Sequence, residues 1–130
     1  MFEYLRVMDN EIQRTQEWIE TLRSKAMSMT KSYSNDRVQT SSGDSLGDIM
    51  CKIVTLEEKL NDMVDDYADR KAEAKKMIFR LHTQEWQDVV YMHDIEFMTF
   101  REIARIKGST TKAVNQKYRR ATKYMKNHLT

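Results

Sequence analysis

The sequence contains no proline, only three glycines and a single cysteine among its 130 residues. Folds with many turns use proline and glycine at those turns, so their scarcity favours long helices. Cys51 cannot form a disulfide within the chain and has no second cysteine with which to bind zinc. We therefore expect a reducing compartment, the cytoplasm.

Long apolar runs are also missing. The sequence has no stretch of about 18 apolar residues, the length that could cross a membrane. The first residues, MFEYLRVMDNEIQR, carry charges where a secretory signal would have an apolar core. We expect a chain with neither a membrane span nor a signal peptide.

The chain lacks the residue groupings that enzymes use. It has no nucleophile placed beside a base, no glycine-rich phosphate loop and no cluster of ligands at metal-binding spacing. The acids between residues 57 and 73 and the three histidines are scattered over different helical faces. We expect no catalytic residue, no metal and no cofactor, and therefore no enzyme.

Acidic residues are scarce at one end of the chain. Residues 99–130 contain nine Lys and Arg and one acid, Glu102, for a net charge of +8, whereas residues 1–98 have a net charge of −6. A strongly basic segment is typical of a surface that binds a polyanion. The alternative is a lysine-rich helix that only faces solvent.

Two heptad patterns predict two long helices. Apolar residues recur at alternating spacings of three and four, as in a coiled coil. The first seam contains Leu5, Met8, Ile12, Thr15, Ile19, Leu22, Ala26 and Met29. The second contains Leu46, Ile49, Ile53, Leu56, Leu60, Met63, Tyr67, Arg70, Ala74, Met77 and Leu81. These seams can close on each other as an antiparallel hairpin over residues 1–81, or they can pair two chains in a homodimer.

The segment between the seams is rich in Ser, Thr, Asn and Asp, which favour turns, so we expect a loop at about residues 31–44. Asp44 or Ser45 can cap the next helix, with Asp48 completing a capping box. The run Asp36-Arg37-Val38-Gln39 suits either a loop that folds back on the helices or a contact with a partner.

Residues 82–130 predict a three-helix unit. Thr83 can cap a helix from Gln84 to about Ile95. Thr99 and Glu102 form a T-x-x-E capping box for the next helix, which Gly108 ends. A last helix then runs from about Thr110 to Asn127. Two helices joined by such a short turn have the outline of a helix-turn-helix, and the predicted fold class is all-α.

The two predicted helices of this motif each have an apolar side. Phe100, Ile103, Ala104 and Ile106 supply that of the first helix, while Val114, Tyr118, Ala121 and Met125 supply that of the second.

The opposite side of the second helix suits the base edges of a major groove, where Arg and Lys bind guanine and Asn and Gln bind adenine. The expected base-reading residues are Thr111, Lys112, Asn115, Gln116 and Arg119. The expected phosphate contacts are Arg101, Arg105, Lys117, Arg120 and Lys123.

The run Thr99-Phe100-Arg101-Glu102-Ile103-Ala104 with Gly108 resembles the bihelical motif of region four of bacterial sigma factors, and the resemblance covers Trp86 to Lys126. As a whole, the chain resembles small phage-encoded regulators with a region-four-like end. The resemblance implies that Thr111, Lys112, Asn115 and Gln116 match positions that touch the promoter −35 element, and that Arg120 matches a backbone contact.

Three residues depart from the family pattern. Lys107 stands where an apolar residue usually precedes the glycine, Ser109 where Val or Ile usually follows it, and Phe97 where a glycine often connects the helices. We expect Ile106 to take the buried role that Lys107 cannot.

The expected function is a DNA-binding transcriptional regulator of phage or prophage origin that binds double-stranded DNA, with host RNA polymerase as a further partner implied by the resemblance. Two other functions stay open. One is a coiled-coil adaptor that binds proteins, and the other is the DNA-recognition component of a phage packaging machine.

Overall fold

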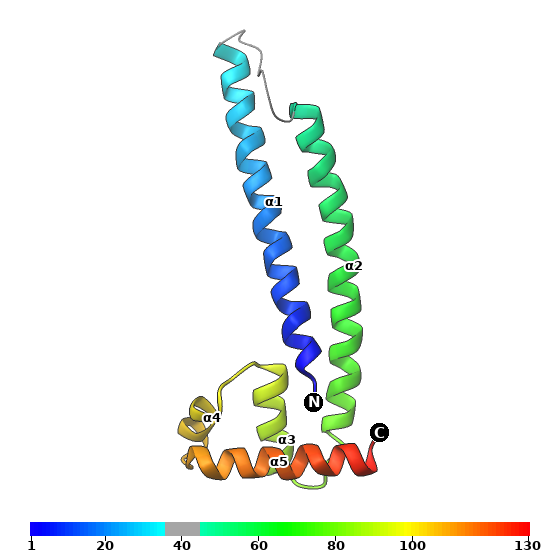
Figure 1. The fold of residues 1–130 in the computed structure, drawn as a ribbon, viewed down its shortest axis with the longest axis vertical. Helices are drawn as coiled ribbons and strands as arrows, with labels where there is room; N and C mark the ends of the chain where they lie inside the picture. The colour runs from blue at the N-terminus through cyan, green and yellow to red at the C-terminus, as the bar shows by residue number, and fades with distance from the viewer. Residues whose placement is uncertain (36–44) are drawn as a thin grey trace. The chain divides into compact units, whose positions relative to one another are not determined.

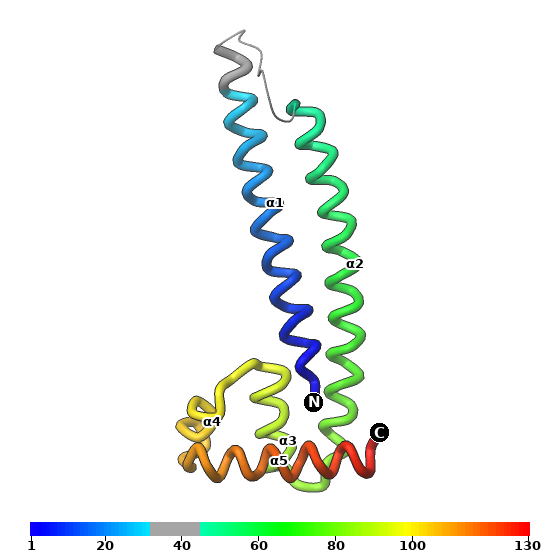
Figure 2. The backbone as a smooth tube through the Cα atoms, in the orientation of Figure 1, coloured from blue at the N-terminus to red at the C-terminus, as the bar shows by residue number. Residues whose placement is uncertain are grey.

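The computed structural model describes residues 1–35 and 45–130, and within these ranges it contains helices and no strands (Figure 1). The expected all-α class is therefore confirmed. The run Asp36-Arg37-Val38-Gln39 lies outside the described residues. The elements are α1 (Glu3–Asn35), α2 (Leu46–Ile78), α3 (Gln84–Val90), the π-helix η1 (Tyr91–Ile95), α4 (Phe100–Lys107) and α5 (Thr111–His128). The backbone trace in Figure 2 follows them in this order.

The chain divides into two compact units. Unit 1 comprises Met1–Met8 and Tyr67–Thr130, and unit 2 comprises Asp9–Asp66. None of the described helices is both long and apolar enough to cross a membrane.

Unit 2 consists of parts of α1 and α2 packed side by side in opposite directions. Thr15 of α1 contacts Met63 of α2, and further along α1 Arg23 contacts Glu57. The residue numbers of the contacts in α2 therefore fall as those in α1 rise, so the two helices are antiparallel. The shared core contains Ile19, Leu22, Ala26, Ile49 and Ile53. These residues belong to the two predicted seams, which explains why each helix buries one stripe and exposes the rest.

Both long helices end at residues other than those predicted. α1 continues to Asn35, so residues 31–35 are helical rather than part of the expected loop. Ser and Asn cost a helix only a few tenths of a kcal/mol each, and Ala26 and Met29 still pack against the core of unit 2 shortly before this end. α2 ends at Ile78, and Leu81 enters the core from the turn that follows. At the start of α2, Ser45 and Asp48 form the expected capping box.

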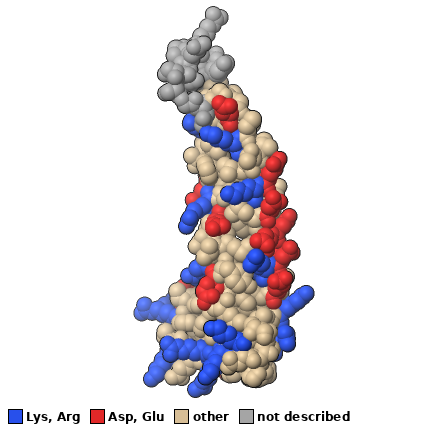
Figure 3. All heavy atoms as spheres, turned by 45° about the vertical axis from the view of Figure 1, so that its right-hand side comes forward, with Lys and Arg blue, Asp and Glu red and all other residues tan. Residues whose placement is uncertain are grey.

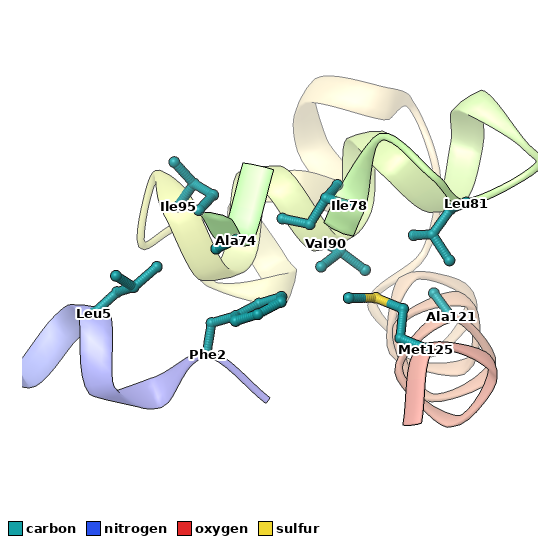
Figure 4. Packing of buried hydrophobic residues seen from close by; sticks show 9 residues of the cluster. All are labelled: Phe2, Leu5, Ala74, Ile78, Leu81, Val90, Ile95, Ala121 and Met125. Atoms are coloured by element: carbon teal, nitrogen blue, oxygen red, sulfur yellow. The ribbon is translucent and has the colours of Figure 1, made fainter. Parts of the chain in front are cut away.

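The main core of unit 1 gathers buried side chains from the N-terminal segment, the end of α2, α3, η1 and α5. Figure 4 shows these side chains converging. The cluster contains Phe2, Leu5, Ala74, Ile78, Leu81, Val90, Ile95, Ala121 and Met125. Ile78 is fully buried although it lies outside the predicted seam, because α2 here meets several elements instead of one helix.

The compact units do not follow the predicted division into residues 1–81 and 82–130. The C-terminal helices share their core with Phe2 and Leu5 and with the last turns of α2. Those turns carry apolar residues that a two-helix seam cannot cover on all sides, and α3 and α5 bury them. The C-terminal motif therefore belongs to a unit that is built from both ends of the sequence.

A π-helical turn and a left-handed residue redirect the chain between α3 and α4. In η1 the amide of Glu96 donates to the carbonyl of Tyr91, and the amide of Met98 donates to that of Met92. Phe97 has a φ of 58°, the left-handed conformation that glycine favours. Arg6 holds this residue in place, donating to its carbonyl at 3.0 Å and lying 5.4 Å above its ring.

Candidate nucleic-acid interface

Local hydrogen bonds set both ends of α4. The hydroxyl of Thr99 accepts from the amide of Glu102 at 3.1 Å, so Thr99 caps α4 as expected. The Glu102 carboxylate accepts from the Thr99 hydroxyl, also at 3.1 Å, and not from the Thr99 amide as in the expected capping box. Gly108 ends the helix with φ 63° and ψ 38°. The amide of Ser109 then donates to the carbonyl of Ala104 at 2.8 Å. A turn of three residues, 108–110, leads directly into α5.

The buried side of α4 differs from the prediction at one residue. Ile103 and Ala104 are buried and Phe100 is partly buried, but Ile106 is 62% exposed. The expectation that Ile106 takes the buried role was therefore wrong. The apolar side follows the spacing i, i+3, i+4 and i+7 from Phe100, and the fourth position on it is Lys107. Lys107 extends to α3 and pairs with Asp88.

α5 begins at Thr111, close to the predicted start, and buries its predicted side. The hydroxyl of Thr110 accepts from the amide of Ala113 at 3.1 Å. Val114, Ala121 and Met125 are buried. Val114 packs with Val89, Ile103 and Ala104 in a small core that ties α5 to α3 and α4. The small side chain of Ala104 suits this close crossing of helices.

Of the predicted base-reading residues, Lys112, Gln116 and Arg119 lie on the side of α5 opposite its buried residues, whereas Thr111 is three residues from the buried Val114. Thr111, Lys112, Gln116 and Arg119 are exposed, and Asn115 is half-buried at the edge of this side. All except Arg119 fall within the first two turns of α5. In helix-turn-helix proteins, the corresponding part of the second helix meets base edges. The geometry therefore presents amide and ammonium donors together at the start of the helix.

The predicted phosphate contacts divide into two groups. Arg101, Arg105, Arg120 and Lys123 are exposed, and among the described residues none of the four forms an ion pair. Lys117 instead lies beside α3, with its ammonium 3.5 Å from the carboxylate of Glu85. On the face drawn in Figure 3, Lys and Arg gather at the end where Figure 1 shows α5. The acids of α3 thus neutralise the cations facing them and leave the outward cations unpaired.

A buried polar network links α5 to η1. Asp94 is 6% exposed, and its Oδ1 accepts from the hydroxyl of Tyr118 at 2.8 Å and contacts His93 Nδ1 at 2.8 Å. Burial, followed by the negative charge of Asp94, raises the pKa of the Tyr118 hydroxyl well above its ordinary value. The hydroxyl therefore remains a hydrogen-bond donor and helps hold α5 in place. Sequence periodicity placed Tyr118 on the buried side but gave no sign of this bond.

Metal chemistry finds no support in the described parts of the chain. No group of three or more His, Cys, Asp or Glu side chains lies close enough together to hold an ion. Cys51 is exposed on α2, far along the sequence from the basic segment.

Comparisons of the chain with protein-family models, with curated proteins and with solved structures find no match.

Proposed function

We propose that α4 and α5 form a DNA-binding helix-turn-helix in which α5 enters the major groove. The observation that carries the proposal is the exposed side of α5, where Lys112 and Gln116 stand opposite the buried Val114 and Ala121 and Asn115 lies half-buried at the edge. Their donors and acceptors match the edges of guanine and adenine. Arg101, Arg105, Arg120 and Lys123 bind the phosphates on either side and set the register of the helix.

The proposed biological role is transcriptional regulation in a phage or prophage. It rests on the resemblance of residues 99–108 to sigma region four and on the charge of +8 in residues 99–130. The two long helices, closed as an antiparallel coiled coil, would carry the DNA-binding motif. Docking on host RNA polymerase is part of the same proposal and rests on the resemblance alone.

Selection of bound duplexes from a random pool tests the proposal directly. The full chain should enrich a defined sequence, and Lys112→Ala should weaken binding to that sequence by about 1–3 kcal/mol while changing its affinity for shuffled duplexes much less. Lys59→Ala, which removes an exposed lysine of unit 2, serves as the control and should change neither affinity. Affinity for any duplex should fall steeply with salt, since phosphate contacts release counterions.

Two results would contradict this function. If the selection enriches no sequence, and Lys112→Ala weakens binding to selected and shuffled duplexes equally, α5 does not read bases. Binding that does not respond to salt would remove phosphate contact altogether.

A protein-binding adaptor remains a second candidate because of an apolar hollow in unit 2. The hollow has a volume of about 770 Å³ and lies between α1 and α2, where Met27, Met50 and Val54 are largely exposed. Large exposed apolar surfaces often mark protein contacts. Light scattering of the full chain tests self-association through this surface, and Met50→Glu should convert a dimer to monomer if the hollow is the contact.

A further inference from the structure

Beside α5 in unit 1 lies a hollow of about 580 Å³, and of the residues that line it only Arg119 and Lys123 belong to the predicted site. Its lining includes three cations of α5, Arg119, Lys123 and Lys126, together with Met1 and Glu3 from the N-terminal segment. All of these residues belong to unit 1, so both ends of the sequence contribute to the hollow. The volume is several times that of one phosphate group, which leaves room for the sugars on either side.

The three cations form one stripe along α5. They are spaced by four and then three residues, which places their side chains on the same helical face. All three are exposed, and among the described residues none of them forms an ion pair. By contrast, Lys107 and Lys117 are paired with acids of α3. The stripe therefore keeps its charge available for a ligand.

The other side chains of the hollow leave the cations as its main ligand-binding groups. Thr122 directs its hydroxyl to the carbonyls of Tyr118 and Arg119, at 2.9 and 3.2 Å. The Tyr118 hydroxyl is bound to Asp94. Glu3 is the single acid that lines the hollow, and it is paired with the amino group of Met1 at 2.5 Å. Three cations around a solvent-filled space suit a phosphate, which accepts several hydrogen bonds and carries a negative charge.

We infer that this hollow binds a phosphodiester of the DNA backbone through Arg119, Lys123 and Lys126. The inference rests on the proposed DNA-binding function and changes one part of it. Arg119 lies in the third turn of α5 and lines the hollow with the two lysines, so it binds phosphate and does not read a base. Lys126 joins the interface, and the segment Met1–Glu3 forms its border.

The test measures duplex affinity by fluorescence anisotropy for a selected sequence and for a shuffled one. Arg119→Ala and Lys126→Ala should weaken both by the same factor, and each should lower the slope of log affinity against log salt by about 1. Glu3→Gln should strengthen both, because it removes a negative charge beside the bound phosphate. Lys59→Ala is the matched control, and circular dichroism checks that each variant is folded.

Loss of affinity for the selected sequence alone in Arg119→Ala would overturn the assignment, since it would make Arg119 a base-reading residue. If Lys126→Ala changes duplex affinity no more than Lys59→Ala does, the hollow is not part of the DNA interface.

A second arm separates this inference from the proposed function. Inorganic phosphate is added to the full chain while the backbone amide signals of Thr122 and Lys126 are followed by NMR. If the wild-type chain binds no duplex but phosphate shifts these signals and Lys126→Ala abolishes the shift, the hollow binds a soluble phosphate compound and the DNA function fails. If neither duplex nor phosphate has an effect, the inference fails as well.

Discussion

Units 1 and 2 both bury apolar helix faces, but they do so in different ways. Unit 2 repeats one arrangement, in which seam residues such as Ile19 and Ile53 meet across two helices. Unit 1 packs six short segments around shared cores and depends on particular residues, among them Phe97 and Gly108 with positive φ and the buried Asp94. A repeated seam tolerates exchange of one apolar residue for another, whereas an irregular unit depends on individual side chains.

The exposed faces of the two units differ in the sign of their charge. Acids dominate the part of α2 in unit 2, including Glu57, Glu58, Asp62, Asp65 and Asp66. α5 contains six Lys and Arg and no acid. Amphipathic spacing predicts a helix equally well in both places, so the spacing says nothing about a partner. The sign of the outward charge, and whether that charge is already paired, is what distinguishes a polyanion-binding surface.

The largest expected effect compares two isoleucines of α4. Ile103 is fully buried and Ile106 is 62% exposed, three residues apart in one helix. Ile103→Ala should lower the free energy of unfolding by about 2–5 kcal/mol, because it leaves a cavity between α4 and α5. Ile106→Ala should change it by no more than about 0.5 kcal/mol. Urea unfolding followed by circular dichroism measures both, and equal losses would contradict the assignment of the buried side.

The next effect concerns the polar network that has no counterpart among the core residues of unit 2. Tyr118→Phe removes the hydrogen bond to Asp94 and leaves a buried carboxyl group with fewer partners, since its Oδ2 already lacks one. The expected loss is about 1–3 kcal/mol in the free energy of unfolding. Tyr124→Phe is the control, and similar losses in the two variants would show that the Asp94 bond contributes little.

The same tyrosine predicts a pH dependence. Burial raises the pKa of Tyr118 above the ordinary value of 10.0, so the folded chain keeps a proton that the unfolded chain releases. Its contribution to stability is therefore complete below about pH 10 and is lost as the pH rises further. Unfolding measured across this range should fall more steeply for the wild-type chain than for Tyr118→Phe. Parallel curves would contradict the raised pKa.

A smaller effect tests the left-handed turn before α4. Both Phe97→Gly and Phe97→Ala remove the aromatic ring and its contact with Arg6. Because φ is 58° at this position, glycine should be more stable there than alanine by about 1 kcal/mol. Thermal unfolding of the two variants gives the difference directly, and greater stability of the alanine variant would mean that residue 97 does not need a positive φ.

The smallest effect concerns a cation that is already paired. Glu85 is largely exposed, so Glu85→Gln should change the free energy of unfolding by no more than about 0.5 kcal/mol when its contact with Lys117 is lost. Chemical unfolding at low and high salt measures this contribution. A loss above 1 kcal/mol would mean that pairing with α3 stabilises α5 more than surface ion pairs usually do.

The residues that could be placed from sequence are those governed by local rules. The caps at Thr83 and Thr99, the helix end at Gly108 and a start of α5 near Thr110 were all predicted, because each depends on hydrogen bonds within a few residues. The buried side of α5 followed from its spacing. Ile106 was misplaced because hydrophobicity was weighed above helical phase, which assigns the fourth apolar-side position of α4 to Lys107.

The rest depended on contacts between residues far apart in the sequence. Nothing near Phe2 or Leu5 indicates that they share a core with Ala121 and Met125. The pairing of Lys107 with Asp88, and the hollow that brings Glu3 beside Lys126, likewise need the folded chain.

The sequence by itself determined that the chain is helical, where α5 begins, and which of its faces is basic, since periodicity, capping and charge act over short distances. Only the tertiary structure decided which of those cations remain unpaired. The sequence shows that a lysine is charged, but whether that charge is available to a ligand depends on whether packing brings an acid beside it. The acids of α3 pair with Lys107 and Lys117. Among the described residues, Arg119, Lys123 and Lys126 have no such partner.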